Sequence, residues 1–436
     1  MKDIQEPNHL PLQFRDLKDH ITPPAAPPVG FQRIFYQDGI FYNRTPSGLI
    51  TRIENTNELY YGVKWTIGQS NPVITQVGKV ELIAEMPLHA QMKAAVVKDD
   101  RSINYYLDRY QLSKKADGTP SVLTGADGQA MLIMPENFYF HTFDDVANNE
   151  RYFLISPYAL AGFTKRTRRM IGIYPGYLDA TKLASISGVM PTSNRTPVQF
   201  LTDARARGTG WYPISYDIWM DIMIMYLIEF ANFNFQATIS AGVTNAASAD
   251  WSAYNGYNPF VQNGEGDTES VLNGEIRVTI PNFVNLGDDP LNTQIAVFRQ
   301  LRLLHGCYEW IAGLNIHNSI ANGSRAFVCH DPTKFAYDTE ADHEMKGNLI
   351  ETDGDVTEWL PGQILPKAVG GSSTTHKCDY GYTYYDNDPA SGWRAVRAFG
   401  SAHSGGDAGL GCSTSHYSSG DASAAAVSRL CGDVIS

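Results

Sequence analysis

Apolar positions recur in short runs in the first third of the chain and in longer runs after it. Between residues 55 and 150, runs such as YYGVKWTI, GKVELIAEM and QAMLIMPENFYFHTF are separated by turns rich in Gly, Asp and Pro, among them KADGTP and GADGQ. Short apolar runs between such turns are typical of β-strands. We therefore expect residues 55–150 to form a mainly β region.

Two stretches after residue 150 carry strong helix signals. TPVQFLTDARARG fits a helix that Gly208 ends, and SYDIWMDIMIMYLIEFANFN fits a helix with Ser215 as its N-cap. The second helix is apolar almost all round, which predicts that it is buried.

A third stretch, TQIAVFRQLRLLHGCYEWIAGL (residues 293–314), is expected to hold a further helix, interrupted near Gly306. The rest of this part consists of short strand-like runs between long loops rich in Gly, Ser and Asp. Few helices among many loops indicate that residues 151–436 form an α+β domain.

The N-terminal end differs from both parts. Residues 1–29 are polar and contain PPAAPP at 23–28, which predicts an extended tether. In residues 30–54, an Asp-Gly pair at 38–39 and a Ser-Gly pair at 47–48 separate alternating runs, as in a small β-meander. A meander this short is marginal by itself, so it would gain most by packing in an oligomer. The alternative is that it forms the edge of the next domain.

Composition narrows the class of protein. A hydrophobic content of 43% and a charged content of 18% are typical of a core-forming globular chain. The net charge of -12 argues against nucleic acid as a partner. The most apolar stretch contains Asp217, Asp221 and Glu229, which argues against membrane insertion. No apolar leader opens the chain, and five Cys without a CxxC pair fit reduced thiols. We expect a protein made in a cytosol and not exported by itself.

The sequence contains no recognisable catalytic or metal-binding motif. His343-Glu344 lacks the second His of a zinc helix, and Cys329, His330 and His343 match no zinc spacing. The acidic stretches DYGYTYYDNDP and ETDGDVTE lack the pattern of a calcium loop and are interpreted as solvated turns. No GxSxG elbow occurs, and nothing local pairs a Cys with a His. We predict no enzymatic activity, no cofactor and no metal.

The segment from Ala398 to Cys431 has an unusual alphabet. It contains no Lys, Glu, Gln, Met, Trp or Asn, although its Gly, Ser and Asp content is typical of a surface. Randomising the adenines of AAC or AAT codons, with the third base kept a pyrimidine, cannot reach Lys, Glu, Gln, Met, Trp or a stop codon. The same change does reach Ser, His, Asp, Tyr, Thr, Gly, Ala and Cys. The alternative is an ordinary loop of small residues.

Several stretches together resemble a known family. WRAVRAFGSAHSGGDAGLGCSTSHYSSGDASAAAVSRLC is similar to the last segment, and RARGTGWYPISYDIWMDIMIMYLIEFANFNFQ to the central helix, of the variable proteins of diversity-generating retroelements, such as the major tropism determinants of phages. FRQLRLLHGCYEWIAGLNI and GYLDATKLASISGVMPTSNRTPVQF also resemble members of this group, and together the stretches cover most of residues 55–436. Gln300 to Leu303 replace the family's Gly-Ile-Glu-Asn, and Tyr308 replaces the first Trp of its Trp-x-Trp.

The resemblance implies a fold and a set of variable positions. The fold is that of C-type lectins, of the formylglycine-generating-enzyme type, and it would lie in residues 151–436 with a variable segment at about 398–431. The positions expected to bind ligand are Ser401, His403, Ser404, Gly406, Asp407, Gly411, Cys412, Thr414, His416, Tyr417, Gly420, Asp421, Ser423 and Ala425.

The burial of these positions can be predicted as well. Apolar residues between them are expected to point inward, namely Phe399, Leu410, Val427 and Leu430. One shared exposed face is expected for His403, Asp407, Thr414, His416, Tyr417, Asp421 and Ser423. The five Cys are expected to be mostly buried, and Cys412 is the one thiol for which an exposed position is left open. Tyr417 is the one large anchor that the segment offers.

The resemblance also implies a function. It favours a non-enzymatic receptor-binding protein of the phage tail tip, which is part of the virion and is made in the bacterial cytoplasm. Its partners would be a host cell-surface receptor, protein or glycan, and other phage tail proteins through the N-terminus. A homotrimer is expected. One alternative is an enzyme of the formylglycine-generating type, or a related oxidoreductase on the same fold, and another is a purely structural fibre or collar subunit. The family's enzymes need a reactive cysteine pair, which is not recognisable here.

Overall fold

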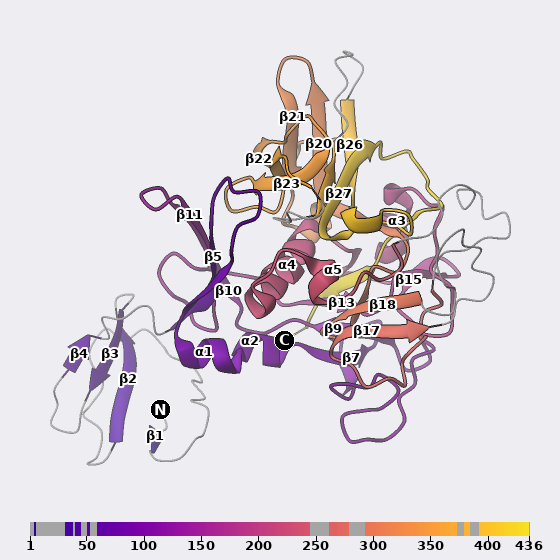
Figure 1. Cartoon of the computed structure of the whole chain (residues 1–436). Helices are drawn as coiled ribbons and strands as arrows, with labels where there is room; N and C mark the ends of the chain where they lie inside the picture. Colours follow the sequence, from indigo (N-terminus) through magenta and orange to yellow (C-terminus); the bar gives the residue numbers. More distant parts are fainter. Residues whose placement is uncertain are drawn as a thin grey trace.

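The structure, a computed structural model, describes residues 59–244, 261–278, 294–372, 379–383 and 392–435 in full. Of Thr293 and of four short strands before residue 59 it describes the backbone alone. The architecture is α+β, as predicted: a few helices lie among several sheets that are mostly antiparallel (Figure 1).

The predicted N-terminal meander is present as a four-stranded antiparallel sheet. Its strands follow chain order: β1 (Ile4–Gln5), β2 (Phe31–Gln37), β3 (Ile40–Arg44) and β4 (Ile50–Arg52). Gln37 pairs with Ile40, which places the first hairpin turn at residues 38–39. Arg44 pairs with Ile50 across the second turn. Apart from β1, the predicted tether at residues 1–29 lies outside the described residues.

The region that follows contains a five-stranded sheet. Its order is β12 (Thr164–Lys165), β10 (Tyr139–Asp145), β11 (Glu150–Ser156), β5 (Tyr61–Thr66) and β6 (Thr75–Gly78). One predicted strand is wrong, because GKVELIAEM forms the helix α1 (Val80–Glu85), with α2 (Pro87–Gln91) directly after it. Leu82, Ile83 and Met86 pack against the core from α1, whereas Val80 is 75% exposed. A one-sided apolar set at this spacing suits a helix.

A six-stranded sheet joins the two parts that the sequence separates at residue 150. Its order is β16 (Trp211–Pro213), β29 (Leu430–Asp433), β13 (Arg169–Gly172), β9 (Gln129–Ile133), β7 (Lys93–Val97) and β8 (Ile103–Tyr106). One apolar core also runs from Tyr61 to Cys431. The expected boundary at residue 150 therefore does not separate two cores.

The helix expected in residues 293–314 is wrong, because this stretch forms strands. β18 (Thr293–Phe298) lies between β17 (Asn273–Val278) and β19 (Leu301–Leu303), and β20 (Tyr308–Ser319) follows. Arg299 and Gln300 both have positive φ, 50° and 72°, as a tight two-residue hairpin turn requires. Ile295 to Phe298 are buried on both faces, and a doubly buried strand has the continuous apolar run that a buried helix also has.

The last part of the chain is built on a nine-stranded sheet. Along its path the order is β22 (Glu344–Asn348), β21 (Gly323–Val328), β20, β26 (Gly392–Phe399), β27 (Gly409–Tyr417), β25 (Tyr380–Tyr382), β23 (Gly354–Trp359) and β24 (Pro366–Val369). The ninth strand, β28 (Ala426–Val427), pairs with β20 in parallel. β25 also pairs with β27 in parallel, so this sheet is mixed. A separate pair consists of β14 (Tyr177–Asp179) and β15 (Lys182–Ala184).

The two strong helix predictions are confirmed. α3 (Pro197–Arg205) begins with a capping box between Thr196 and Gln199. α4 (Tyr216–Phe230) is buried from Tyr216 to Ile228 and lies at the centre of the molecule, with the short α5 (Phe235–Thr238) beside it (Figure 1). Ser215 is the N-cap residue of α4, but its side chain makes no capping hydrogen bond. Within the described residues, every helix falls short of the length or the apolar character that crossing a bilayer would take.

Candidate functional site

The C-terminal segment is fixed to the core by its apolar residues, as predicted. It begins at the end of β26, continues through a loop and β27, and closes with β28 and β29. Phe399, Leu410, Val427 and Leu430 are at most 1% exposed. Trp219 of α4 donates a hydrogen bond from Nε1 to the Leu410 carbonyl oxygen over 2.6 Å, which ties β27 to the central helix. The backbone of the segment therefore rests on the most buried element of the fold.

Nine of the fourteen predicted positions reach solvent, four of them as exposed residues and five as half-buried ones. The exposed ones are His403, Gly406, Gly420 and Asp421. The half-buried ones are Asp407, His416, Tyr417, Ser423 and Ala425.

The other five predicted positions are buried, and the prediction of exposure made for one of them, Thr414, is wrong. They are Ser401, Ser404, Gly411, Cys412 and Thr414. For Thr414 the cause is β25, whose Gly381 and Tyr382 pair with Ser413 and Thr414 and thereby place β27 between two neighbours. Cys412 is fully buried, like the other described thiols, Cys307, Cys329 and Cys431. Cys378 lies outside the described residues.

One group of contacts connects two predicted positions through Arg397. The guanidinium carbon of Arg397 lies 3.6 Å from the centre of the Tyr417 ring and 4.6 Å from that of Tyr308. Its Nη1 donates to Ser423 Oγ over 3.1 Å. Arg397 is 3% exposed, and burial lowers its pKa although the neighbouring rings and Asp421 oppose this. A guanidinium stacked on aromatic rings fixes the direction of Tyr417.

A second group of contacts joins two more predicted positions through Tyr382. The Tyr382 hydroxyl donates to Asp407 Oδ2 over 2.8 Å, and burial together with this carboxylate raises the pKa of Tyr382. The ring centres of Tyr382 and His416 are 6.1 Å apart, and those of Tyr380 and Tyr382 are 4.4 Å apart. His416 Nε2 lies 3.1 Å from the Thr383 carbonyl oxygen. Asp407 and His416, nine positions apart in sequence, are thus held by one strand that sequence reasoning assigned to no site.

The loop after β26 connects to the same surface. The hydroxyl oxygens of Tyr308 and Ser404 are 3.2 Å apart, and Ser401 Oγ lies 3.1 Å from Nδ1 of the exposed His403. Tyr308 also contacts Arg397, so its ring connects this loop to the group of contacts around Arg397 and Tyr417. Ser401 is 1% exposed, so its contact with His403 presents no nucleophile to solvent.

Sequence reasoning missed Arg397, Tyr380 and Tyr382. The two tyrosines belong to DYGYTYYDNDP, which was interpreted as a solvated turn. The signal was its tyrosine content, because a solvated turn has no need of so many aromatic rings. With Tyr417, the half-buried Tyr380 and Tyr382 give the surface three large anchors in place of one.

A buried carboxyl group lies directly beneath β27. Asp379 is 2% exposed and accepts a hydrogen bond from the Gly411 N–H over 2.8 Å. Burial raises its pKa to about 8, and the nearby carboxylates Asp355 and Asp407 add to this effect. A Cβ at Gly409 would collide with the Asp379 carboxyl group, so any larger residue at this position requires the Asp379 side chain to move.

The metal candidates of the sequence do not converge. Cys329 is 2% exposed, His330 directs Nδ1 to Asp217, and His343 directs Nδ1 to the Ala341 carbonyl oxygen. Across the part of the chain that the structure describes, no three His, Cys, Asp or Glu side chains are grouped to hold a metal ion.

Comparison with known proteins adds no relative. A scan against protein-family models gives no match for this chain, and neither does a search of curated proteins.

Proposed function

We propose that this protein is a receptor-binding protein of a phage tail tip, which presents residues 398–431 as a diversified surface on a C-type-lectin-like domain. The observation that carries the proposal is that this segment combines a restricted set of residue types with buried apolar anchors. Its alphabet excludes Lys, Glu, Gln, Met, Trp and Asn, and yet its large apolar residues are buried while nine of its predicted positions reach solvent. The restricted alphabet fits diversification at adenines, and the buried apolar residues fit a fixed backbone beneath side chains that can change.

The arrangement of the last strand supports a lectin-like domain. β29 pairs with β13 and with β16, so the end of the chain returns to strands near the start of the second part. The displayed segment lies just before this closing strand, between β26 and β29. A surface held at both ends by paired strands can change its side chains without loss of the backbone path.

The chemistry of the surface supports binding rather than catalysis. Tyrosine supplies rigid amphipathic contact area, and Ser, His and Asp add adaptable polar contacts. Tyr380 and Tyr382 would be fixed members of the surface, and Arg397 and Tyr308 are buried and would support Tyr417 from beneath. The variable members would be His403, Asp407, His416, Tyr417 and Ser423. The enzyme alternative lacks a comparable group of reactive side chains among the residues described at this surface.

The most direct test is the DNA around the gene. We expect a near-copy of the codons for residues 398–431 that differs at adenines of the template, close to a reverse transcriptase gene. A flanking region with neither feature, in a complete genome, would refute the diversification part of the proposal.

A binding experiment tests the surface itself. The purified chain is incubated with a panel of bacterial strains, and the strain that adsorbs it is used for variants. The triple variant Asp407→Ala, His416→Ala, Tyr417→Ala should lose at least about tenfold in affinity, which corresponds to about 1.4 kcal/mol. The control triple variant Tyr110→Ala, Asp117→Ala, His343→Ala removes the same residue types elsewhere and should bind normally. Equal adsorption by both variants would refute the assignment of this surface.

A further inference from the structure

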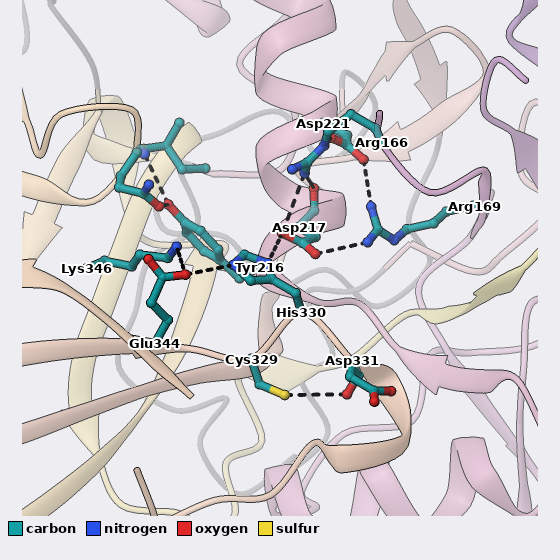
Figure 2. Close-up of polar contacts among 12 residues, drawn as sticks. Arg166, Arg169, Tyr216, Asp217, Asp221, Cys329, His330, Asp331, Glu344 and Lys346 are labelled. Atoms are coloured by element: carbon teal, nitrogen blue, oxygen red, sulfur yellow. Dashed lines mark hydrogen bonds and ion pairs between the residues drawn. The ribbon is translucent and has the colours of Figure 1, made fainter. Parts of the chain in front are cut away.

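A second concave site lies at the first turn of α4, apart from the C-terminal segment. It is a cleft of about 530 Å³, a size that suits a small ligand. Its walls come from β10, from residues 162–169, from the start of α4, from His330 and β22, and from Gly362 and Gln363. No residue of 398–431 lines it. Figure 2 shows its polar side chains converging from these separate elements.

Cations outnumber carboxylates in the lining. The cations are Lys165, Arg166, Arg169 and Lys346, and the carboxylates are Asp217 and Glu344. The whole chain has a net charge of -12, so this local excess runs against the rest of the molecule. A cleft lined by one sign of charge attracts ligands of the opposite sign.

The carboxylate Asp217 is already neutralised within the protein. Its Oδ2 lies 2.9 Å from Arg169 Nη2, and its Oδ1 lies 3.5 Å from Arg166 Nη2 and 2.9 Å from His330 Nδ1 (Figure 2). Burial alone would raise the pKa of Asp217, but the hydrogen bond from His330 and the two arginines lower it to about 2. Asp221, behind the cleft, binds both arginines as well. These acids therefore orient the cations and do not leave a free negative charge in the cleft.

Hydrogen-bond donors remain after these pairs are formed. Arg169 is 4% exposed, and its Nε, itself buried behind the cleft wall, has no hydrogen-bond partner among the described residues. Lys165 is exposed and forms no ion pair within the part of the chain that the structure describes. Gln363 accepts the Tyr216 hydroxyl through Oε1 over 2.9 Å, which leaves its amide N–H groups for another acceptor. The start of the 15-residue helix α4 adds a partial positive charge.

From this arrangement we infer that the cleft is a second binding site, and that it takes a small oxyanion-bearing ligand, a carboxylate or phosphate group on a molecule about the size of one sugar. Lys165 and Lys346 would contact the anion, because they are the lining cations outside the buried Arg–Asp cluster. The Lys346 side chain is 12% exposed and donates to Glu344 over 2.7 Å, so the anion would share this ammonium group with the Glu344 carboxylate. The site is independent of the C-terminal segment, so its failure would leave the receptor-binding proposal untouched.

The test is titration of the full chain with glucuronate, inorganic phosphate and glucose, followed by calorimetry at constant ionic strength. We expect saturable binding of glucuronate, of phosphate or of both, and none of neutral glucose. Glucuronate alone would assign a sugar carboxylate, and phosphate alone a phosphoryl group.

Two double variants decide whether the cleft is responsible. The double variant Lys165→Gln, Lys346→Gln should lower the affinity for the anion at least about fivefold, as expected for the loss of charge-assisted contacts. Lys98→Gln with Lys367→Gln is the matched control, because Lys98 is exposed and Lys367 pairs with Glu358 over 2.7 Å, as Lys346 does with Glu344. The control should bind as the parent does. Absence of saturable binding, binding of glucose as strong as that of the anions, or equal affinities of the two variants would overturn the inference.

Discussion

Asp379 lies beneath β27, and its protonation should affect the stability of the fold around this strand. Its folded-state pKa is about 8, against an ordinary value of 3.8. Between these two values the folded chain keeps the proton and the unfolded chain has lost it, so the free energy of unfolding falls as the pH rises. The contribution is complete below about pH 4 and is lost by about pH 8.

The variant Asp379→Asn should remove this dependence. It keeps an acceptor for the Gly411 N–H but cannot ionise. Urea unfolding at pH 5, 6, 7 and 8 should show a stability difference, variant minus parent, that grows by up to about 1.4 kcal/mol per pH unit. A difference that stays constant over this range would show that Asp379 does not titrate there.

Substitutions at Leu410 and His403 should have different effects on stability, because Leu410 anchors the segment in the core and His403 lies on its exposed surface. Leu410 is 1% exposed and packs in the core, so Leu410→Ala should cost about 2–5 kcal/mol in the free energy of unfolding. His403 is exposed, so His403→Ala should change stability by no more than about 0.5 kcal/mol. Both values can be measured by urea unfolding at one pH, and similar losses for the two variants would contradict the separation.

At the scale of elements, the sequence predicted what local chemistry determines. The capping residues of α3 and the all-round apolar character of α4 are local, and both helices are present. The strands β18 to β20 were mistaken for a helix because burial on both faces removes the alternation that identifies a strand.

The candidate site was predictable to the same degree. The anchors Leu410 and Val427 could be read from the apolar pattern, and so could exposed positions such as His403. The burial of Thr414 could not, because it depends on β25, which lies some thirty positions earlier in the chain and whose parallel pairing leaves no local signal.

The apolar α4 carries two buried carboxylates, Asp217 and Asp221, and their ion pairs should be essential for the stability of the fold. Asp221 is 1% exposed and accepts from Arg166 Nε over 2.6 Å and from Arg169 Nη1 over 3.2 Å. Asp221→Ala leaves two guanidinium groups, those of Arg166 and Arg169, to share the Asp217 carboxylate, and this excess of buried positive charge should cost about 3–5 kcal/mol. Replacing both partners, Asp221→Leu with Arg169→Met, should recover part of the loss in urea unfolding. A double variant no more stable than Asp221→Ala would argue that the cost comes from packing and not from charge.

At the scale of the whole molecule, the N-terminal sheet raises the question of assembly. Its two edge strands are short, β1 having two residues and β4 three, so the sheet offers little area for a core of its own. Packing against copies of itself would supply the missing burial. Repetition of a receptor-binding surface would also raise avidity without any new contact.

We therefore expect the full chain to be a homotrimer held by its N-terminal sheet. Light scattering coupled to gel filtration at micromolar concentration should give about three times the chain mass of 48.2 kDa. Deleting residues 1–54 should give a monomer, and because binding would then occur at a single site, its retention on receptor-bearing cells should fall by at least about a hundredfold. Leu410 and the other anchors lie outside the deleted part, so near-UV circular dichroism should stay unchanged and serve as the control for folding. A monomeric full chain, or a truncated chain that remains trimeric, would place the contacts between subunits elsewhere.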